Sequence, residues 1–562
     1  MAGGVKKPVN IFRLKDLGEP KEVFNWRLWF AVVSFGLLGA ARGIDEGLIS
    51  GAFNSPDFKN MIGYSSYSRV QQADIKANVS AMVQIGSVGG AMIASFVCDR
   101  IGRIKATRFL CVLWIIGIIV FMVGGVNGNL GAIYAGRFIA GLGVGQTPVV
   151  SPVYIAEVAP ASIRGLCTCF FTGAVYIGIV LAYFTNYGCA LHLNGNSHNR
   201  WLVPTSLHIM MAGIIFLLSF AQYESPRFLV KSDRADKAAQ VLSKLRQLPV
   251  DGDYVREELA SIQLAHSKEL EATSGVGWLG KVKEMLLNRS NLYRVYLSFM
   301  VQLLGQWSGA GAITIYAPDL FELLGISGTQ EGLLVTAVFG IIKLIAALAC
   351  ALFLVDVVGR KRSLLLGISL QSISMIYIAA FLTAVPQLGV VKGYELPQSR
   401  QAASRGAIAM IYISGCGWAL GWNSMQYLLT AELFPLRIRA LATSCAMTLH
   451  FANQYGSSRA LPNMLLPVSQ GGISPKGTFW CFAAVTLLGG LWVWFSVPET
   501  SGRSLENMDS LFELPWYRIG LFGNRDAEQR DLVYQEKQRQ TDEYEERTEH
   551  KSMDNKDSIT PV

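Results

Sequence analysis

Charged residues are scarce in this chain. Only 16% of its 562 residues are Asp, Glu, Lys or Arg, and 51% are hydrophobic, whereas a charged share of about 25% is usual for soluble domains. A single soluble core stops growing beyond about 250–300 residues, so it cannot hide this much apolar surface. The composition therefore excludes an ordinary soluble protein.

Sequence motifs of soluble enzymes are also missing. The chain has no P-loop, no hydrolase elbow and no metal-ligand constellation, so neither ATP-driven transport nor an enzyme is indicated. Its nine cysteines are odd in number and lie mostly inside apolar blocks, away from metal-ligand spacing. We interpret them as small packing residues. We expect no cofactor, with a proton as the one coupling ion.

Long apolar runs are what the chain has instead. About 20 residues cross the roughly 30 Å hydrocarbon layer of a bilayer as a helix. Twelve such blocks occur, at 27–50, 76–97, 107–126, 131–151, 167–188, 202–221, 294–316, 331–355, 363–384, 406–430, 440–465 and 478–497. The sequence therefore predicts an all-α polytopic membrane protein with twelve transmembrane helices.

Basic residues in the short loops predict the orientation. Lys and Arg gather at 98–108 and 356–362, and such loops lie in the cytoplasm. With twelve spans, both termini are then cytoplasmic. The segment 1–26 is too long and polar to be a cleaved signal peptide. We interpret the net charge of +9 as a membrane-anchoring bias and expect no nucleic-acid partner.

Repeated motifs divide the chain into two six-helix halves, 27–221 and 294–497. "DRIGRIK" recurs as "DVVGRKR", "EVAPASIRG" as "ELFPLRIRA" and "ESPRF" as "PETSGR", each time after the corresponding block. The polar stretch 222–293 between the halves is predicted to be a cytoplasmic helical linker, and 498–562 a cytoplasmic, largely disordered tail. Parallel six-helix repeats with a site between them describe the major facilitator fold.

The repeated loops predict a cytoplasmic gate. Its acids and bases are Asp99, Arg103, Glu157, Arg164, Asp356, Arg360, Glu432 and Arg439. We expect Asp99 and Asp356 to pair with the arginines of "EVAPASIRG" and "ELFPLRIRA", which would lock the halves together on the cytoplasmic side. The alternative is that these residues only fix topology and loop shape.

With these motifs, and with "GIDEGLISG", "GRFIAGLGVG" and "PVYIAEVAPASIRG", the chain resembles the sugar porter family of the major facilitator superfamily over nearly its whole length. The resemblance implies alternating-access transport of a small polyol-like substrate, often coupled to protons. "VFGIIK" and "GWNSMQYL" look similar to the fungal branch that includes quinate and sugar-acid permeases. A monomer in the plasma membrane is the default for such a protein.

The resemblance also implies which residues bind substrate. The positions that match the family's ligands are Thr172, Gln306, Gly311, Tyr316, Asn423, Tyr427, His450 and Gln454. Several of them depart from the family pattern, since Gly311 replaces an Asn and Asn423 and Tyr427 fall where the family has glycine and tryptophan. A site built for one pattern of hydroxyls rejects a mismatched ligand, so glucose is not the expected substrate.

Cations within the apolar blocks favour an acidic substrate. Lys343 lies in the middle of its block, where a lysine costs about 2.5–3.5 kcal/mol on insertion scales. Arg42 and Arg459 are further candidates for anion contacts, because arginine matches carboxylates bidentately. The alternatives are that Arg459 reaches the membrane interface, that Arg42 pairs with Glu46 four residues on, and that Lys343 has a structural partner. His450 is equally well explained as a core residue.

Asp45 is the candidate coupling acid. It occupies the acid position of the family's first helix, where proton symporters carry the proton, and the family's partner for it is Arg137. An adjacent arginine stabilises the ionised carboxylate, whereas desolvation disfavours it. Alternation between an arginine-paired and an unpaired state would therefore make Asp45 release and bind a proton. Three functions remain open: a proton-coupled symporter of a monosaccharide-sized acid such as galacturonate or quinate, a neutral monosaccharide transporter, and a non-transporting nutrient sensor.

Overall fold

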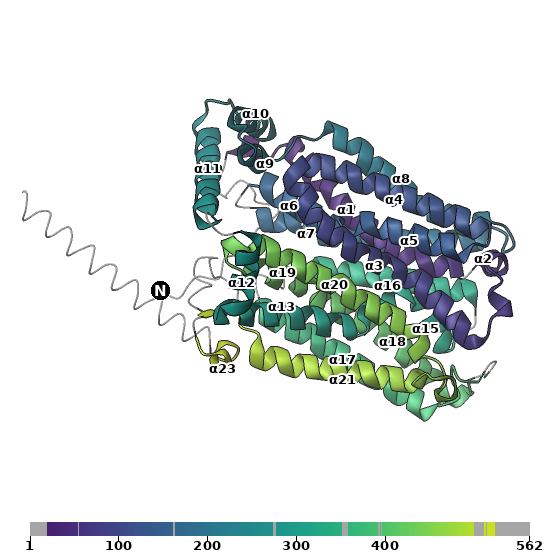
Figure 1. Ribbon diagram of the computed structural model, residues 1–562. Helices are drawn as coiled ribbons and strands as arrows, with labels where there is room; N and C mark the ends of the chain where they lie inside the picture. The colour runs from purple at the N-terminus through teal and green to yellow at the C-terminus, as the bar shows by residue number, and fades with distance from the viewer. Residues whose placement is uncertain are drawn as a thin grey trace, which may run out of the picture.

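The computed structural model describes residues 20–53, 55–160, 163–273, 277–326, 328–350, 358–391, 394, 396–499, 511–512 and 514–522. Over these ranges the chain forms helices and no strand, and they gather into two bundles that lie side by side (Figure 1). The all-helical prediction is confirmed. The first nineteen residues and those after 522, including most of the predicted tail, lie outside the described ranges.

The first half consists of six long helical stretches, one of which is made of two helices joined end to end. They are α1 (Trp26–Phe53), α3 (Arg69–Ile101), α4 (Arg103–Val126), α5 (Leu130–Val144) with α6 (Thr147–Val158), α7 (Arg164–His192) and α8 (Asn199–Leu218). A short helix, α2 (Pro56–Met61), follows α1. Each of the six predicted blocks of this half therefore falls on one helical stretch.

The second half repeats this plan with more interruptions. Its helices are α13 (Arg289–Trp307) with α14 (Ala310–Ile315), α15 (Ala317–Leu323), α16 (Thr329–Ala349), α17 (Arg360–Ala384), α18 (Gln398–Leu420) with α19 (Trp422–Leu433), α20 (Leu436–Met464) and α21 (Ser474–Ser496). Gly309 has φ of +86° between α13 and α14, a conformation that glycine adopts without strain. The seventh spanning stretch therefore breaks there.

Nine stretches of the described chain are long and apolar enough to span a membrane: the six of the first half, α16, α17 and α21. The other three predicted blocks fall on α13–α14, α18–α19 and α20. The first two are interrupted at glycines, and α20 carries His450, Gln454 and Arg459. Broken and polar helices are tolerated at membrane depth where they line a protein interior. Each of these three stretches contributes residues to a cavity inside the protein.

Three of the four linker helices gather at one end of the first half, whereas the fourth packs against α13 and α20 of the second half. The four are α9 (Pro226–Lys231), α10 (Ala235–Arg246), α11 (Asp253–Thr273) and α12 (Trp278–Leu287), and α9–α11 lie beyond one end of the spanning helices (Figure 1). Asn25 Nδ2 donates to Leu245 O at 2.8 Å, which ties α10 to the start of α1. We call this end of the bundle the inner end and the opposite one the outer end.

A glutamate caps the same helix in each half. Glu224 accepts hydrogen bonds from the backbone N–H groups of Arg103 at 2.9 Å and Ile104 at 3.3 Å, at the first turn of α4. A carboxylate satisfies the free N–H groups of a helix start and opposes the positive end of its dipole. The acid of "ESPRF" thus fixes the loop of "DRIGR".

Glu499 does the same for α17 in the second half. It accepts hydrogen bonds from the N–H groups of Arg360 at 2.7 Å and Lys361 at 3.2 Å. The turns before the two helices match as well, because Gly102 and Gly359 have φ of +90° and +100°. The sequence repeat is therefore also a repeat of loop geometry.

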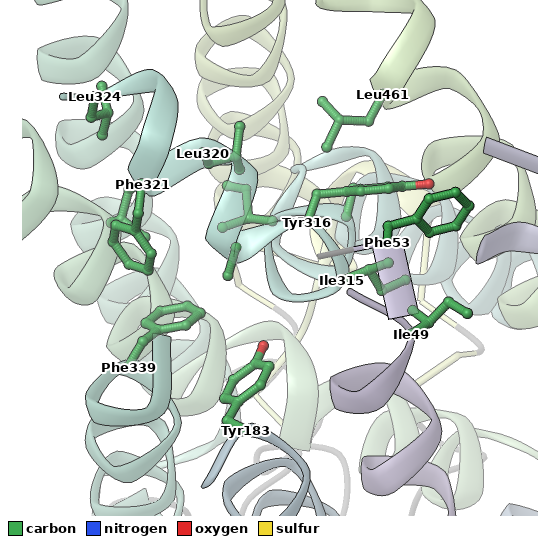
Figure 2. Packing of buried hydrophobic residues seen from close by; sticks show 14 of the residues in the cluster. Ile49, Phe53, Tyr183, Ile315, Tyr316, Leu320, Phe321, Leu324, Phe339 and Leu461 are labelled. Carbon is green, nitrogen blue, oxygen red and sulfur yellow. The ribbon is translucent and has the colours of Figure 1, made fainter. Parts of the chain in front are cut away.

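Aromatic and aliphatic side chains join the two halves toward the outer end. Figure 2 shows Ile49 and Phe53 of α1 beside Ile315 and Tyr316 of the second half, all of them buried. Tyr183 of α7 reaches across as well, and its hydroxyl donates to Thr314 O at 2.6 Å. Burial of this apolar surface stabilises the contact between the halves at this level.

Candidate functional site

A cavity lies between the two halves, deep in the bundle. The first half contributes α1 and α7, and the second contributes α13, α14, α16, α18, α19 and α20. Its polar and aromatic lining residues are Arg42, Glu46, Thr172, Tyr176, Gln306, Thr314, Lys343, Trp418, Asn423, Tyr427 and Gln454, with Gly311 also at the wall. Most of the predicted substrate-binding residues therefore surround one space.

Arg42 and Glu46 link the halves at this cavity. Arg42 Nε lies 3.2 Å from Glu46 Oε1, one turn on, so the pair proposed from the sequence is formed. Arg42 also donates to the Tyr427 hydroxyl, and its Nη2 lies 2.9 Å from His450 Nε2. Glu46 accepts a hydrogen bond from Gln454 at 3.0 Å. The α1 charges thus reach three residues of the second half.

Lys343 lines the cavity without a carboxylate. Its side chain is 2% exposed, and Nζ donates to Thr314 Oγ1 at 2.7 Å. The ring centroids of Tyr176 and Phe339 lie 5.4 and 5.2 Å from Nζ. Among the described residues no acid oxygen lies within 4 Å of it. The Glu46 carboxylate of the same cavity lies farther away and is paired with Arg42. The Lys343 cation, whose direct contacts are a hydroxyl and two aromatic faces, therefore remains incompletely compensated.

Asp45 and Arg137 form a buried ion pair beside the cavity. The Asp45 Oδ1 to Arg137 Nη1 distance is 2.6 Å, and each residue is 2% exposed. Arg137 Nε also donates to Val79 O at 3.1 Å, which anchors the guanidinium between α3 and α5. The contact expected from the sequence is present, although neither residue lines the cavity wall.

Close helix packing places this acid. Gly43 precedes it by two residues, and a Cβ there would overlap the Val175 carbonyl of α7. Only a glycine lets the α1 and α7 backbones approach this closely. The glycines of "GIDEG" therefore hold α1 against α7, while Asp45 is buried with Arg137 and Glu46 lines the cavity.

His450 lies behind the cavity wall. It is fully buried, and its Nδ1 lies 2.9 Å from Gln302 Oε1, while Nε2 faces the Arg42 guanidinium. Gln306 Nε2 lies 3.3 Å from the same Nδ1, and the guanidinium donates toward Nε2. His450 thus orients Arg42, and it does not itself line the cavity.

Two predicted site residues lie elsewhere. Tyr316 is buried in the apolar contact of Figure 2, and its hydroxyl donates to Ser458 O at 3.1 Å. Arg459 Nη2 lies 2.9 Å from Asp74 Oδ1 near the start of α3. Each lies five residues beyond a cavity-lining residue, Gly311 or Gln454, and with about 3.6 residues per turn a spacing of five brings a side chain to a different face.

Ion pairs join the halves at the outer end. Lys76 Nζ lies 2.5 Å from Asp319 Oδ1, which joins α3 to α15. The Arg459–Asp74 pair joins α20 to α3, and Arg69 donates to Gly389 O at 3.0 Å. These contacts close the outer end of the bundle over the cavity.

At the inner end, the described ion pairs stay within the first half and its linker. Arg103 Nη2 lies 2.8 Å from Glu157 Oε1. Asp99 contacts Arg103 at 3.5 Å and Lys231 at 2.9 Å. In this arrangement the Asp99 carboxylate is held by Arg103 and Lys231, because the i, i+4 spacing and α9 bring these two cations to it. The pairing of Asp99 with Arg164 stays a prediction.

The second-half members of the predicted gate are only partly described. Asp356 lies outside the described residues, and so does the side chain of Glu432. Arg439 Nε donates to Phe434 O at 3.0 Å, at the start of α20. The backbone N–H of Arg360 is held by Glu499.

Comparison with known proteins identifies the family. A family model described as sugar (and other) transporter matches residues 30–512. The chain belongs to this transporter family. It is 31% identical to a probable quinate permease of Aspergillus niger over 89% of this chain and 90% of that protein. It is 29% identical to a quinate permease of Emericella nidulans over 89% and 91%.

Solved structures share the fold. The xylose transporter XylE from E. coli, in a partially occluded inward-open conformation, matches with a TM-score of 0.69 at 22% identity, over 85% of this chain and 100% of that chain. XylE bound to 6-bromo-6-deoxy-D-glucose matches at 0.68 and 24%, over 86% and 99%. The chain is thus a multi-pass membrane transporter with the major facilitator fold, and it is not an enzyme.

Several residues of this transporter's site escaped the sequence prediction. Glu46 lines the cavity, although the sequence indicated it only as a possible partner of Arg42. Tyr176, Thr314 and Trp418 line it too, and helical spacing from Thr172 and Gly311 could have indicated the first two. His208 lies 3.6 Å from Asp45, and its position inside an apolar block was the signal available for it.

Proposed function

We propose that this protein is an alternating-access, proton-coupled symporter of a monosaccharide-sized sugar acid, similar to galacturonate or quinate. The observation that carries the proposal is Lys343, a buried ammonium at the cavity wall with a hydroxyl and aromatic rings as its neighbours. A substrate carboxylate would supply the missing counter-charge. Charge-assisted hydrogen bonds of this kind are roughly twice as strong as neutral ones.

The remaining lining suits the hydroxyls of such a substrate. Gln306, Asn423 and Gln454 present amides that both donate and accept, and Thr172 adds a hydroxyl. Arg42 is a second candidate for the carboxylate, in competition with Glu46. In this proposal the substrate anion lies between Lys343 and Arg42, and its ring hydroxyls face α13, α19 and α20.

Coupling is assigned to Asp45 and Arg137. Protonation of Asp45 would weaken its bond to Arg137 and free α1 to move against α5, which is a switch between two arrangements. The outer ion pairs would open and the inner gate residues would close in the outward-facing state. We also propose that both termini are cytoplasmic and that the protein lies in the plasma membrane.

The relatives support this reading. The curated ones above are named quinate permeases, and one structural neighbour is a proton:xylose symporter. The second candidate function is transport of a neutral hexose or pentose. It is favoured by the Arg42–Glu46 pair, which cancels one of the two cavity cations, and by the amide-rich wall. A nutrient sensor without transport is the third.

Uptake assays separate these candidates. The protein is expressed in a yeast that lacks its own carriers, and uptake of labelled quinate, galacturonate, xylose and glucose is measured at pH 5 and pH 7.5, with and without an uncoupler. We expect one of the acids to accumulate at pH 5 and the uncoupler to abolish accumulation. Uptake of neutral sugars alone, unaffected by excess acid, would falsify the sugar-acid proposal, and no uptake with retained binding would favour a sensor.

A further inference from the structure

A buried histidine of α8 lies against the Asp45–Arg137 pair. His208 is 3% exposed, and its Nε2 is 3.6 Å from Asp45 Oδ1. Its Nδ1 is 3.0 Å from the carbonyl oxygen of Thr205, one turn earlier in α8. The Trp114 indole of α4 packs edge-on to the imidazole, at 5.9 Å between ring centroids. The ring is thus held between α1, α4 and its own helix.

The contact with Thr205 assigns one proton of the imidazole. A carbonyl oxygen only accepts hydrogen bonds, so Nδ1 carries a hydrogen and donates it. In the neutral ring, Nε2 then presents a lone pair toward Asp45. Nε2 has no hydrogen-bond partner in the structure, and neither does Nη2 of Arg137 beside the same carboxylate. Two buried nitrogens around one acid thus remain available.

An ionised Asp45 and a neutral His208 face each other with lone pairs only. One added proton converts this repulsion into a hydrogen bond, whichever atom holds it: the carboxyl O–H donates to Nε2, or the imidazolium N–H donates to the carboxylate. Buried polar groups cost free energy until they are paired. The geometry therefore creates a place for one proton between α1 and α8.

We propose that His208 shares the coupling proton with Asp45, so that the proton-binding site of this transporter is an Asp45–His208 pair held by Arg137. The proposal rests on the proposed function, since it deepens the assignment of Asp45 as the coupling acid. Loading takes one proton from water into the Oδ1–Nε2 contact, and release returns it to water on the other side. The net charge of the three groups changes from zero to plus one and back.

The groups around His208 fit this role. From α1 it meets Asp45, and through that carboxylate Arg137 of α5. From α4 it meets the uncharged Trp114. Two tyrosines of α7 are engaged elsewhere, since Tyr176 lines the cavity and Tyr183 donates to Thr314. Among the described residues, Asp45 is thus the acid that lies against this histidine.

Two substitutions test the proposal because each keeps one half of the imidazole. The amide of His208→Asn reproduces the Nδ1 bond to Thr205, and the longer amide of His208→Gln places a donor near Asp45. Neither side chain binds a proton. Uptake and accumulation of the substrate are measured from pH 4.5 to 8, together with counterflow in de-energised cells. His192→Gln, at the exposed end of α7, is the matched control.

We expect both variants to exchange substrate in counterflow and to accumulate it poorly. Their pH of half-maximal uptake should move about one unit lower, because loading now places the proton on Asp45 beside Arg137 without a second acceptor. A parent-like pH profile in His208→Asn would mean that only the hydrogen bond to Thr205 matters. A parent-like profile in His208→Gln would mean that a fixed hydrogen-bond donor beside Asp45 suffices. Either result overturns the proposal. If the parent protein shows no proton coupling at all, the proposed function itself fails instead.

Discussion

The two halves of this transporter share their loops but differ in their buried polar chemistry. The first half holds a cluster of ionisable groups, Asp45, Arg137 and His208. The second half contains neutral amides: Gln371 donates to Ser308 at 2.9 Å, and Gln302 to the Gln426 carbonyl at 3.3 Å. The repeat that is visible in the sequence is thus preserved at the surface and not inside.

This difference separates two tasks. Ionisable groups change charge when they take up a proton, whereas amides are always neutral and present fixed donors and acceptors. A half that couples and a half that recognises can therefore move against each other without one task disturbing the other. Lys343 is the charged residue that the second half contributes to the described cavity wall, and we assign it to the substrate carboxylate.

The largest effect is expected from removing the carboxylate of Asp45 in the first half. In Asp45→Asn the side chain stays polar and nearly isosteric, but it cannot bind a proton, so accumulation against a gradient should be lost completely while counterflow continues. Accumulation ratios and counterflow are measured in the same cells. Asp251→Asn, in the exposed linker, is the control. If Asp45→Asn still concentrates substrate, the ionisable cluster is not the coupling site.

The role of the Lys343 charge at the cavity wall is tested by Lys343→Met. Truncating one partner of a buried charge pair costs about 2–5 kcal/mol of binding, so the KM for the acid should rise by about 30-fold or more. Competition by neutral sugars should be unchanged. Lys476→Met, exposed at the outer end, is the control. Unaltered acid uptake would show that the amide half needs no charge.

The same substitution should stabilise the empty protein. Lys343 is buried without a carboxylate, and replacing an incompletely compensated buried charge by an apolar side chain of similar size is often stabilising, here by about 1 kcal/mol. Thermal unfolding of the purified protein in detergent measures this. A lower midpoint in Lys343→Met would mean that Thr314 and the two rings compensate the charge fully.

A smaller effect is expected where the halves meet at the outer end. Lys76→Met removes its partly exposed pair with Asp319, which is worth up to about 1 kcal/mol. A cysteine introduced at the cavity wall by Gly311→Cys should then react about threefold faster with a thiol reagent added from the outside. The charge swap Lys76→Asp with Asp319→Lys should restore slow labelling. Equal rates in all three proteins would remove this pair from the outer closure.

The smallest effect concerns the loop caps that the halves share. Burial raises the pKa of the Glu224 carboxyl above its usual value, although the N–H donors of Ser225, Arg103 and Ile104 partly oppose this. The folded protein therefore binds this proton more tightly than the unfolded chain does. The contribution of Glu224 to the free energy of unfolding should fall as the pH rises from its ordinary pKa through the raised one.

Thermal unfolding between pH 4 and 7 tests this sign. Glu224→Gln should weaken the cap and lower the free energy of unfolding by about 1 kcal/mol, which is seen as a lower midpoint temperature. It should also remove the part of the pH dependence that comes from Glu224. Glu499→Gln, at the repeated position of the second half, is the matched comparison. A Glu224→Gln curve that runs parallel to that of the parent protein would contradict the prediction.

The architecture could be predicted because it depends on long apolar runs and on motifs that recur between the halves. The family resemblance also identified the contact of Asp45 with Arg137. It was less successful for side chains that share a helix but not a face. Tyr316 and Arg459 lie on helices that do line the cavity, yet they point into the outer contact between the halves.

Partners that meet only in three dimensions were beyond the sequence. Nothing in the spacing of Asp99 and Lys231 indicates that α9 folds back onto the loop, so the contact between these two residues was not predicted. His208 lies far along the chain from Asp45, in another apolar block, and only the packing of α8 on α1 brings them together. Local patterns fix helices, whereas tertiary packing decides which charges meet.

The ion pairs of the buried centre also determine how the membrane voltage acts on the carrier. Asp45 cancels Arg137 and Glu46 cancels Arg42, which leaves Lys343 as the uncompensated charge among the described residues that line the cavity. In the proposed symport of one proton with one anion, the anion neutralises that charge and the proton restores it. Each charge that crosses the field changes the energy by about 2.3 kcal/mol per 100 mV. The empty and the fully loaded carrier would then feel the same force, and the proposed cycle would be electroneutral, with the pH gradient alone driving accumulation.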